Sequence, residues 1–337
     1  MKGGAVAYSW EEMIEQFRKL GGTADNLIQR VGSRGRGIFP IDNTKPVRLR
    51  VPRNLLVPIE EIQFVDDQLR IQKSAAIGTA ERDFIEKYEN EFSWGGGGRS
   101  DCAVFLEGMK RFHLDIPHES RSKSFVTWMA NGVDSPVGQR FLNSRSVKYG
   151  NKTVLMPVME LVNHGPSANG YDIGDDISIK GEFADEVLVR YSDQDSLGVF
   201  MSYGFASPEP MAFSLPLNFK GTRELVIERK INLDAKLGSF SVPTFTITES
   251  KVTLSSLVIG SSAAPRVPKS IFLTILESAG WQNPAEEFER ACHQNRMICL
   301  GLLETADAQE GHFALTFRKM LYFQLKAMSH CFGTRTL

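Results

Sequence analysis

The chain has 337 residues, which is enough for two domains or for one domain with a large insertion. Apolar residues make up 42% and charged residues 23%, values typical of a soluble globular protein. The formal net charge is −1, without the basic excess by which proteins usually bind nucleic-acid phosphates. We therefore expect no direct nucleic-acid partner.

The apolar segments are too short for membrane insertion or secretion. No stretch approaches the roughly 20 apolar residues of a membrane span, and the N-terminus lacks the apolar block of a signal peptide. The four cysteines, Cys102, Cys292, Cys299 and Cys331, show no close spacing, and no histidine lies at metal-ligand spacing. We expect free thiols, no metal site, no membrane partner and an intracellular, cytoplasmic location.

The N-terminal segment predicts a helix followed by strands. Ser9 and Glu12 form a capping box, residues 10–20 carry an apolar stripe at helical spacing, and Gly21-Gly22 ends the helix. From residue 27 the pattern changes to strands and turns. Residues 47–51 alternate valine or leucine with arginine, which is typical of a half-buried strand.

The segment from about residue 74 to about residue 135 is helical in pattern. Residues 80–88 and 103–110 predict helices on either side of the run Gly95–Gly98. No Lys-Ser or Lys-Thr follows the glycines as a phosphate-binding loop requires. The run is therefore interpreted as a flexible connector.

Beyond the helical segment, residues 154–162 form an apolar run that we expect to be buried. Residues 186–191 predict a strand, and residues 196–203 a short helix or turn. Alternating patterns within 221–258 are followed by a linker at 261–265. Three helical patterns follow it, near 268–279, 284–304 and 313–330.

Four short motifs occur in a fixed order along this chain. They are Gly35-Arg36-Gly37 before a strand, Ser144-Arg145, Asn163-His164 after the apolar run, and Tyr203-Gly204-Phe205. In this order and spacing they resemble the SET-domain methyltransferases, in particular the group typified by the plant Rubisco large-subunit methyltransferase. The resemblance extends over about residues 30–217.

The resemblance implies an α+β fold in which a mainly-β SET domain is built from short sheets. It implies an N-terminal helix at 1–26 and a SET domain at 27–220 with a helical insertion at about 74–135. A mainly helical C-terminal domain at 221–337 would then help to recognise the substrate protein.

The resemblance also implies a cofactor and a set of site residues. S-adenosyl-L-methionine would lie against the Gly35-Arg36-Gly37 turn and the Asn163-His164 backbone, and Arg145 would pair with its carboxylate. Tyr203 would border the point of methyl transfer and orient the acceptor. The expected walls of the substrate channel are Tyr191, Phe205 and Phe213.

The implied reaction is methyl transfer from a sulfonium to a protein lysine. Such a displacement needs a neutral, aligned nitrogen, whereas a free lysine has a pKa of about 10.4, so that deprotonation at pH 7 costs about 4–5 kcal/mol. A narrow apolar channel beside a sulfonium cation disfavours the ammonium form and lowers this cost. Positioning of the two reactants then supplies much of the acceleration.

Four departures from the family pattern concern the site. Ser196-Leu197-Gly198-Val199-Phe200 stands where close relatives have a Ser-Asn pair and a glutamate before Tyr-Gly-Phe. Gly165 follows Asn-His where the family often has serine, Glu160 stands where aspartate is frequent, and Phe213 replaces a tyrosine of the plant group. The last departure bears on substrate choice and on the number of methyl groups transferred. Alternative functions are methylation of a histidine or a small amine, and a non-catalytic peptide-binding SET module.

Each site residue also has a purely structural interpretation. Gly35–Gly37 is then a plain tight turn, and Asn163-His164 a capped turn with its imidazole in the core. Arg145 becomes part of a surface salt bridge, and the aromatic residues pack in the core.

Overall fold

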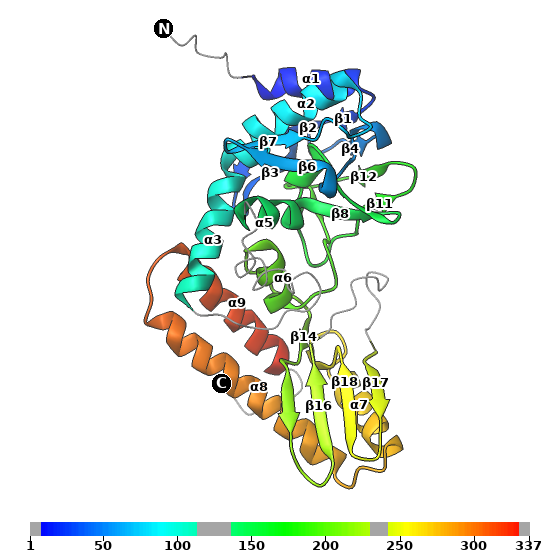
Figure 1. The fold of residues 1–337 in the computed structure, drawn as a ribbon, viewed down its shortest axis with the longest axis vertical. Helices are drawn as coiled ribbons and strands as arrows, with labels where there is room; N and C mark the ends of the chain where they lie inside the picture. Colours follow the sequence, from blue (N-terminus) through cyan, green and yellow to red (C-terminus); the bar gives the residue numbers. More distant parts are fainter. Residues whose placement is uncertain (1–7, 113–135, 230–241, 330–337) are drawn as a thin grey trace. The chain divides into compact units, whose positions relative to one another are not determined.

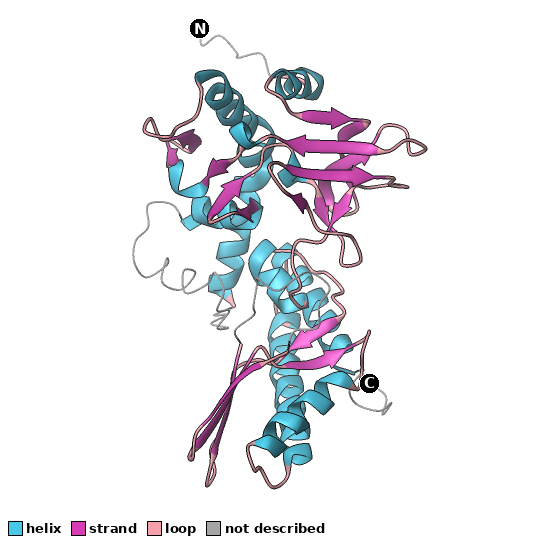
Figure 2. Cartoon of the chain, turned by 90° about the vertical axis from the view of Figure 1, so that its right-hand side faces the viewer, coloured by secondary structure: helices cyan, strands magenta, loops and turns pink. Residues whose placement is uncertain are grey.

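The computed structural model describes residues 8–112, 136–229 and 242–329 (Figure 1). The chain divides into two compact units, the first comprising Met1–Val104 and Asp134–Tyr191 and the second Phe105–Val133 and Ser192–Leu337. Helices and short sheets occur in both units (Figure 2), which confirms the predicted α+β class. The predicted domain boundaries at 26/27 and 220/221 stay predictions, because compact units and functional domains need not coincide.

The first unit begins with helix α1 (Trp10–Lys19), as the sequence predicts. The Ser9 side chain accepts a hydrogen bond from the Glu12 amide, and the Glu12 side chain accepts one from the Ser9 amide. This capping box satisfies two amides that the first helical turn leaves without partners. The helix buries Met13, Ile14 and Phe17 in the core of the unit.

The largest sheet of the first unit has the order β1 (Thr23–Asp25), β4 (Val47–Val51), β12 (Ile177–Gly181) and β11 (Asp172–Ile173), all antiparallel. The three apolar residues of β4 are fully buried, which confirms the predicted half-buried strand. Three pairs of strands accompany this sheet: β2 (Leu27–Gly32) with β3 (Gly35–Pro40), β6 (Ile62–Val65) with β7 (Gln68–Ile71), and β10 (Asn163–His164) with β13 (Leu188–Val189). A three-stranded sheet has β9 (Lys152–Leu155) at its centre, between β5 (Val57–Pro58) and β8 (Ser146–Tyr149).

Residues 154–162 are all buried, as their apolar sequence predicts. They are not one strand, because β9 ends at Leu155 and the short 3₁₀ helix η4 (Met159–Leu161) follows. The predicted strand at 186–191 is reduced to the two residues of β13. Two further 3₁₀ turns, η1 (Arg53–Leu55) and η2 (Ile59–Glu61), and helix α5 (Pro136–Arg145) also belong to the first unit.

The interpretation of the glycine run as a flexible connector is wrong. Helix α2 (Thr79–Tyr88) continues through a π-helical segment, η3 (Glu89–Gly98), into helix α3 (Arg99–Arg111). A Cβ at Gly95 would lie 1.7 Å from the carbonyl oxygen of Asn90, and Gly97 has a φ of 123°. The run is therefore a helical segment whose close backbone approach and positive φ require glycine.

The second unit contains the end of α3 from Phe105 and, after Tyr191, begins again with helix α6 (Ser196–Tyr203). Strand β14 (Met211–Phe213) pairs with β19 (Val258–Ser261). A four-stranded sheet has the order β15 (Leu217–Phe219), β16 (Glu224–Glu228), β18 (Lys251–Ser255) and β17 (Thr244–Ile247). Helices α7 (Val267–Ser278), α8 (Pro284–Asp307) and α9 (His312–Ser329) confirm the three predicted helical patterns.

Aromatic side chains from three helices fill one part of the second unit. Phe200 of α6 lies 5.3 Å from Phe105 of α3, and 5.5 Å and 5.4 Å from Phe313 and Phe317 of α9, between ring centroids. All four rings are buried. Rings at these separations stabilise the unit through the apolar area that they bury, and the edge-to-face geometry of Phe200 and Phe313 adds to it.

Three of the cysteines, Cys102, Cys292 and Cys299, are buried and reduced, and Cys331 lies outside the described residues. Within residues 8–112, 136–229 and 242–329, no three His, Cys, Asp or Glu side chains come together in an arrangement suited to a metal ion. No helix in the described part of the chain is long and apolar enough to cross a bilayer.

Substituting Gly95 by alanine tests the helical packing of the glycine run. Glycine to alanine within a helix normally stabilises by about 0.5–1 kcal/mol. At Gly95 the added methyl group meets the Asn90 carbonyl, and we expect Gly95→Ala to lower the free energy of unfolding by about 1–3 kcal/mol. Urea denaturation measures the change.

The control is Gly174→Ala. A Cβ at this position would meet nothing within 4 Å, so this variant should change the free energy of unfolding by under about 0.5 kcal/mol. A Gly95→Ala protein as stable as the wild type would contradict this packing.

Candidate functional site

The glycines of the Gly35-Arg36-Gly37 motif have different structural roles. Gly35 follows the β2–β3 turn with a φ of 89°, a conformation that favours glycine, and a Cβ there would meet nothing within 4 Å. Gly37 is closely packed, because its Cβ would lie 2.4 Å from Glu186 Oε1 and 2.6 Å from Asn163 Nδ2. The missing side chain at Gly37 lets these two polar groups approach the backbone of β3.

Asn163 joins the glycine turn to the polypeptide around β10. Its Nδ2 donates to the Arg36 carbonyl oxygen at 2.9 Å and to Glu186 Oε1 at 2.7 Å. The second carboxylate oxygen of Glu186 accepts from Arg34 Nη1 at 2.9 Å, and the Glu186 side chain is almost completely buried. The structure thus brings the predicted turn and the predicted asparagine together.

Neither Glu186 nor Arg34 is recognisable from the sequence as part of this junction. Glu186 stands just before the short strand β13, and Arg34 lies in the β2–β3 turn. An acidic residue beside a short apolar strand is a common pattern, so the sequence carries no local signal of its partners. The two residues are separated by 152 positions along the chain.

His164 faces the core, with 3% of its surface exposed. Its Nδ1 accepts a hydrogen bond from the Tyr191 amide at 3.2 Å and therefore carries no proton in this arrangement. The Tyr191 ring lies 5.2 Å from the imidazole, and its hydroxyl donates to the Val162 carbonyl at 2.6 Å. The backbone of β10 runs parallel to β13, with His164 opposite Val189. This geometry matches the structural interpretation of the side chain and leaves the role of the β10 backbone as a prediction.

Arg145, the last residue of α5, lies beside a buried acid rather than in a surface salt bridge. Its Nε is 3.9 Å from Glu160 Oε2, and its guanidinium lies 4.6 Å from the centre of the Phe141 ring. Glu160 also accepts a hydrogen bond from the Tyr88 hydroxyl at 3.2 Å. The Glu160 side chain is fully buried, whereas 21% of the Arg145 side chain is exposed.

A second carboxyl group, that of Glu89, is fully buried near Glu160 at the start of η3. Burial raises the pKa of Glu89 well above its ordinary value, and the negative charge of Glu160 raises this pKa further. Burial also raises the pKa of Glu160, although Arg145 and the hydroxyls of Ser93 and Tyr88 oppose that shift. Two neighbouring buried carboxyl groups favour a state in which Glu89 keeps its proton.

Arg36 uses its side chain for packing. Its Nη1 donates to the Phe92 carbonyl oxygen at 2.6 Å, and a Cβ at Gly96 would lie 2.4 Å from the same nitrogen. The glycine run of η3 therefore accommodates the Arg36 side chain. The predicted contact of Arg36 with the cofactor therefore has to come from its backbone.

The second unit holds the other predicted site residues. Tyr203 ends α6 and lies 6.0 Å from Phe205 between ring centroids, and both side chains are half-buried. Phe213, which has 1% of its surface exposed, packs with Met211 and Val258 and corresponds to the core-packing interpretation. The proposed functions of these three residues stay predictions.

Comparisons with known proteins give distant structural similarity only. No family model matches the chain, and no curated protein is similar to it in sequence. A solved structure described as the SET domain of LSMT bound to lysine and AdoHcy aligns with 95% of this chain and 89% of its own. The identity is 12% and the TM-score 0.41, values that establish neither the family nor the activity of this chain.

Substituting Glu89 by glutamine tests whether this carboxyl group is protonated in the folded protein. The raised pKa means that the folded chain holds a proton that the unfolded chain releases above about pH 4.5, so the free energy of unfolding falls as the pH rises. Glu89→Gln removes this proton linkage. We expect its stability to fall less than that of the wild type between about pH 5 and about pH 8. Urea denaturation across this range measures the slopes.

The matched control is Glu60→Gln, at an exposed glutamate of the same unit. This variant should keep the pH dependence of the wild type. A Glu89→Gln protein with the wild-type slope would mean that Glu89 is ionised in the folded state.

Proposed function

We propose that this chain is an S-adenosyl-L-methionine-dependent methyltransferase of the SET type and that its acceptor is a protein lysine. The observation that carries the proposal is the junction of Gly37, Asn163 and Glu186. Two motifs that the resemblance assigns to one cofactor site are separated by more than a hundred residues, yet a direct hydrogen bond joins Asn163 to the Arg36 carbonyl. If the motifs matched the family only by chance, there would be no reason for them to contact each other in the folded chain.

The residues around this junction fit the proposed cofactor in two respects. The space beside Gly35 is open, so a ligand can approach that backbone without a steric clash. Arg145 is partly exposed and its guanidinium suits a carboxylate. In the proposed arrangement the cofactor contacts the backbone of residues 35–37. The same site is bordered by Asn163 and His164. Arg145 binds the carboxylate of the cofactor's amino-acid part.

When bound, S-adenosyl-L-methionine supplies a methyl group activated on a sulfonium. The protein has to exclude water, present a neutral nitrogen and align it. We assign the orientation of the acceptor to the Tyr203 hydroxyl and channel walls to the half-buried Tyr191 and Phe205. The third predicted wall, Phe213, packs in the core of its unit. A protein substrate, the absence of a nucleic-acid partner and a cytoplasmic location stay predictions.

Calorimetric titration with S-adenosylhomocysteine and S-adenosylmethionine tests the proposed function. We expect the wild type to bind both and Asn163→Ala to bind at least tenfold more weakly, a loss of about 1.4 kcal/mol. The substitution removes the hydrogen bonds to the Arg36 carbonyl and to Glu186, and so it releases β3 from β10.

The control for this titration is Asn54→Ala. The Asn54 amide binds the Leu20 carbonyl and Glu81 within the same unit, away from the glycine turn, and its loss should leave the affinity unchanged. If the wild type binds neither compound, the methyltransferase proposal is wrong and a peptide-binding module becomes the better function. If Asn163→Ala binds like the wild type, the cofactor site lies elsewhere.

Removing the Tyr203 hydroxyl tests the acceptor side. Tyr203→Phe deletes one hydroxyl and almost no volume, so folding and cofactor affinity should stay unchanged. We expect turnover to fall ten- to a thousandfold, about 1.4–4 kcal/mol, as when an active site loses one positioned donor. Labelled methyl transfer to lysate proteins identifies the substrate, and single-turnover kinetics on that protein measures the effect.

The control is Tyr322→Phe, at an exposed tyrosine of α9. Full activity of Tyr203→Phe would assign Tyr203 to packing.

A further inference from the structure

The position of Tyr203 depends on how helix α6 is held. This helix has eight residues, and Tyr203 is the last of them. Gly204 follows with a φ of 86° and donates its amide to the Phe200 carbonyl, which ends the helix in a left-handed cap. Because α6 is so short, any tilt or shift at its first turn is carried directly to Tyr203.

Asp195 fixes the first turn of α6. Its Oδ1 accepts a hydrogen bond from the Gly198 amide at 2.9 Å, the arrangement by which an aspartate caps a helix. A Cβ at Gly198 would lie 2.7 Å from Gln194 Oε1, so glycine allows the Gln194 side chain to approach this turn. The neighbouring residue, Gln194, accepts a hydrogen bond through Oε1 from the Ser202 hydroxyl at 3.0 Å. Ser202 directly precedes Tyr203 in the helix.

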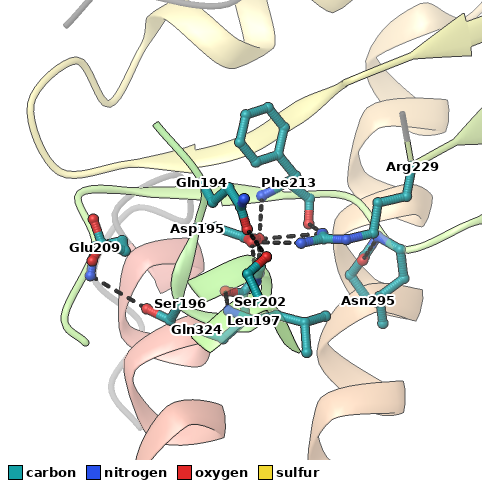
Figure 3. Close-up of polar contacts among 12 residues, drawn as sticks. Gln194, Asp195, Ser196, Leu197, Ser202, Glu209, Phe213, Arg229, Asn295 and Gln324 are labelled. Carbon is teal, nitrogen blue, oxygen red and sulfur yellow. Dashed lines mark hydrogen bonds and ion pairs between the residues drawn. The ribbon is translucent and has the colours of Figure 1, made fainter. Parts of the chain in front are cut away.

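The Asp195 carboxylate also binds three other segments of the second unit (Figure 3). Arg229, which follows β16, donates both Nη groups to it, and Gln324 of α9 donates Nε2 at 2.7 Å. The Phe213 amide of β14 donates to it at 2.9 Å, and Arg229 Nη1 also donates to the Phe213 carbonyl at 3.2 Å. One carboxylate therefore connects α6, α9, β14 and the end of β16.

Asp195 and Arg229 are both completely buried. Burial alone would raise the pKa of Asp195, but the charge and hydrogen bonds of Arg229 and the amides of Gly198 and Phe213 outweigh it and hold the pKa below its ordinary value. A buried ion pair often adds little stability compared with apolar residues of the same volume. Here the hydrogen bonds of the ion pair restrict both the rotation of α6 and its position along the helix axis.

We propose that Asp195 is a positioning residue that fixes the orientation of Tyr203 through the first turn of α6, with Arg229 and Gln324 as its supports. The role of Tyr203 in methyl transfer rests on the proposed function, whereas the positioning itself does not. Asp195 is buried and would not contact the substrate. Aromatic packing of Phe200 also holds α6 against α9, and the hydrogen bonds of Asp195 add a fixed direction at the first turn.

The first test observes Tyr203 without using activity. The protein is labelled with 3-fluorotyrosine, and the ¹⁹F resonance of Tyr203 is assigned by its absence in Tyr203→Phe. We expect Asp195→Asn to shift or broaden this resonance while the tyrosines of the first unit keep theirs. Arg223→Ala is the matched control, because Arg223 donates to the Thr248 and Ala279 carbonyls of the same unit and binds none of the partners of Asp195.

The second test measures kinetics well below the melting temperature of every variant. We expect Asp195→Asn to lower kcat at least tenfold while its affinity for S-adenosylhomocysteine and its KM for the acceptor protein stay within about twofold. Arg223→Ala should keep the wild-type kcat, even if its melting temperature falls as far. An unshifted Tyr203 resonance, or an equal loss of kcat in Arg223→Ala, overturns the proposal.

A double variant covers the case in which Asp195→Asn does not fold because Arg229 is left buried without a counter-charge. Asp195→Asn with Arg229→Gln removes both charges and keeps polar groups in place, and we expect it to fold with the same change at Tyr203. A wild-type resonance in this protein would overturn the positioning role. If the resonance responds as expected but the wild type transfers no methyl group, the proposed function fails and the positioning role stands.

Discussion

A carboxylate that is removed from water must recover its lost hydration from the protein or give up its charge. Asp195 is fully surrounded by donors from Gly198, Phe213, Arg229 and Gln324. Glu186 is satisfied by Asn163 and Arg34. Glu89 illustrates the second outcome, because burial beside Glu160 favours its neutral form. These requirements decide which distant segments of the chain are joined in each unit.

In the first unit this requirement explains the glycine turn without invoking a ligand. Glu186 needs a donor, and Asn163 reaches it only because Gly37 has no side chain in the way. The same asparagine amide then binds the Arg36 carbonyl. Asn163 therefore has a structural role whatever it contributes to a cofactor site. A substitution that affects cofactor affinity must accordingly be interpreted together with its effect on the position of β3.

Features set by neighbouring residues could be predicted from the sequence. The capping box of α1, the alternation in β4 and the apolar periodicity of α7, α8 and α9 each depend on residues a few positions apart. The glycine run predicts a connector because glycine is a poor helix former. The structure overrides this propensity, and one of the contacts involved, with the Arg36 side chain, comes from about sixty residues earlier in the chain.

The candidate site likewise combines features that neighbouring residues determine with contacts between distant residues. The sequence predicts which residues belong to motifs, and the contact of the glycine turn with Asn163 agrees with that grouping. Partners such as Glu186 and Arg34 lie 152 positions apart in the sequence, in segments of ordinary composition. A capping aspartate at Asp195 is recognisable from the helix that follows it. Its pairing with Arg229 and Gln324 is not, because those residues come from a strand end and a distant helix.

Helix α6 combines these constraints in one element. Its first six residues, Ser196–Met201, are buried, whereas Ser202 and Tyr203 at its other end are half-buried. A helix that is apolar along most of its surface can be buried in several rotational positions with similar energy, because apolar contact has no preferred direction. Directional hydrogen bonds at its first turn select one of them. A buried ion pair at the base of α6 is therefore consistent with a need for a defined position at its partly exposed end, where Tyr203 lies.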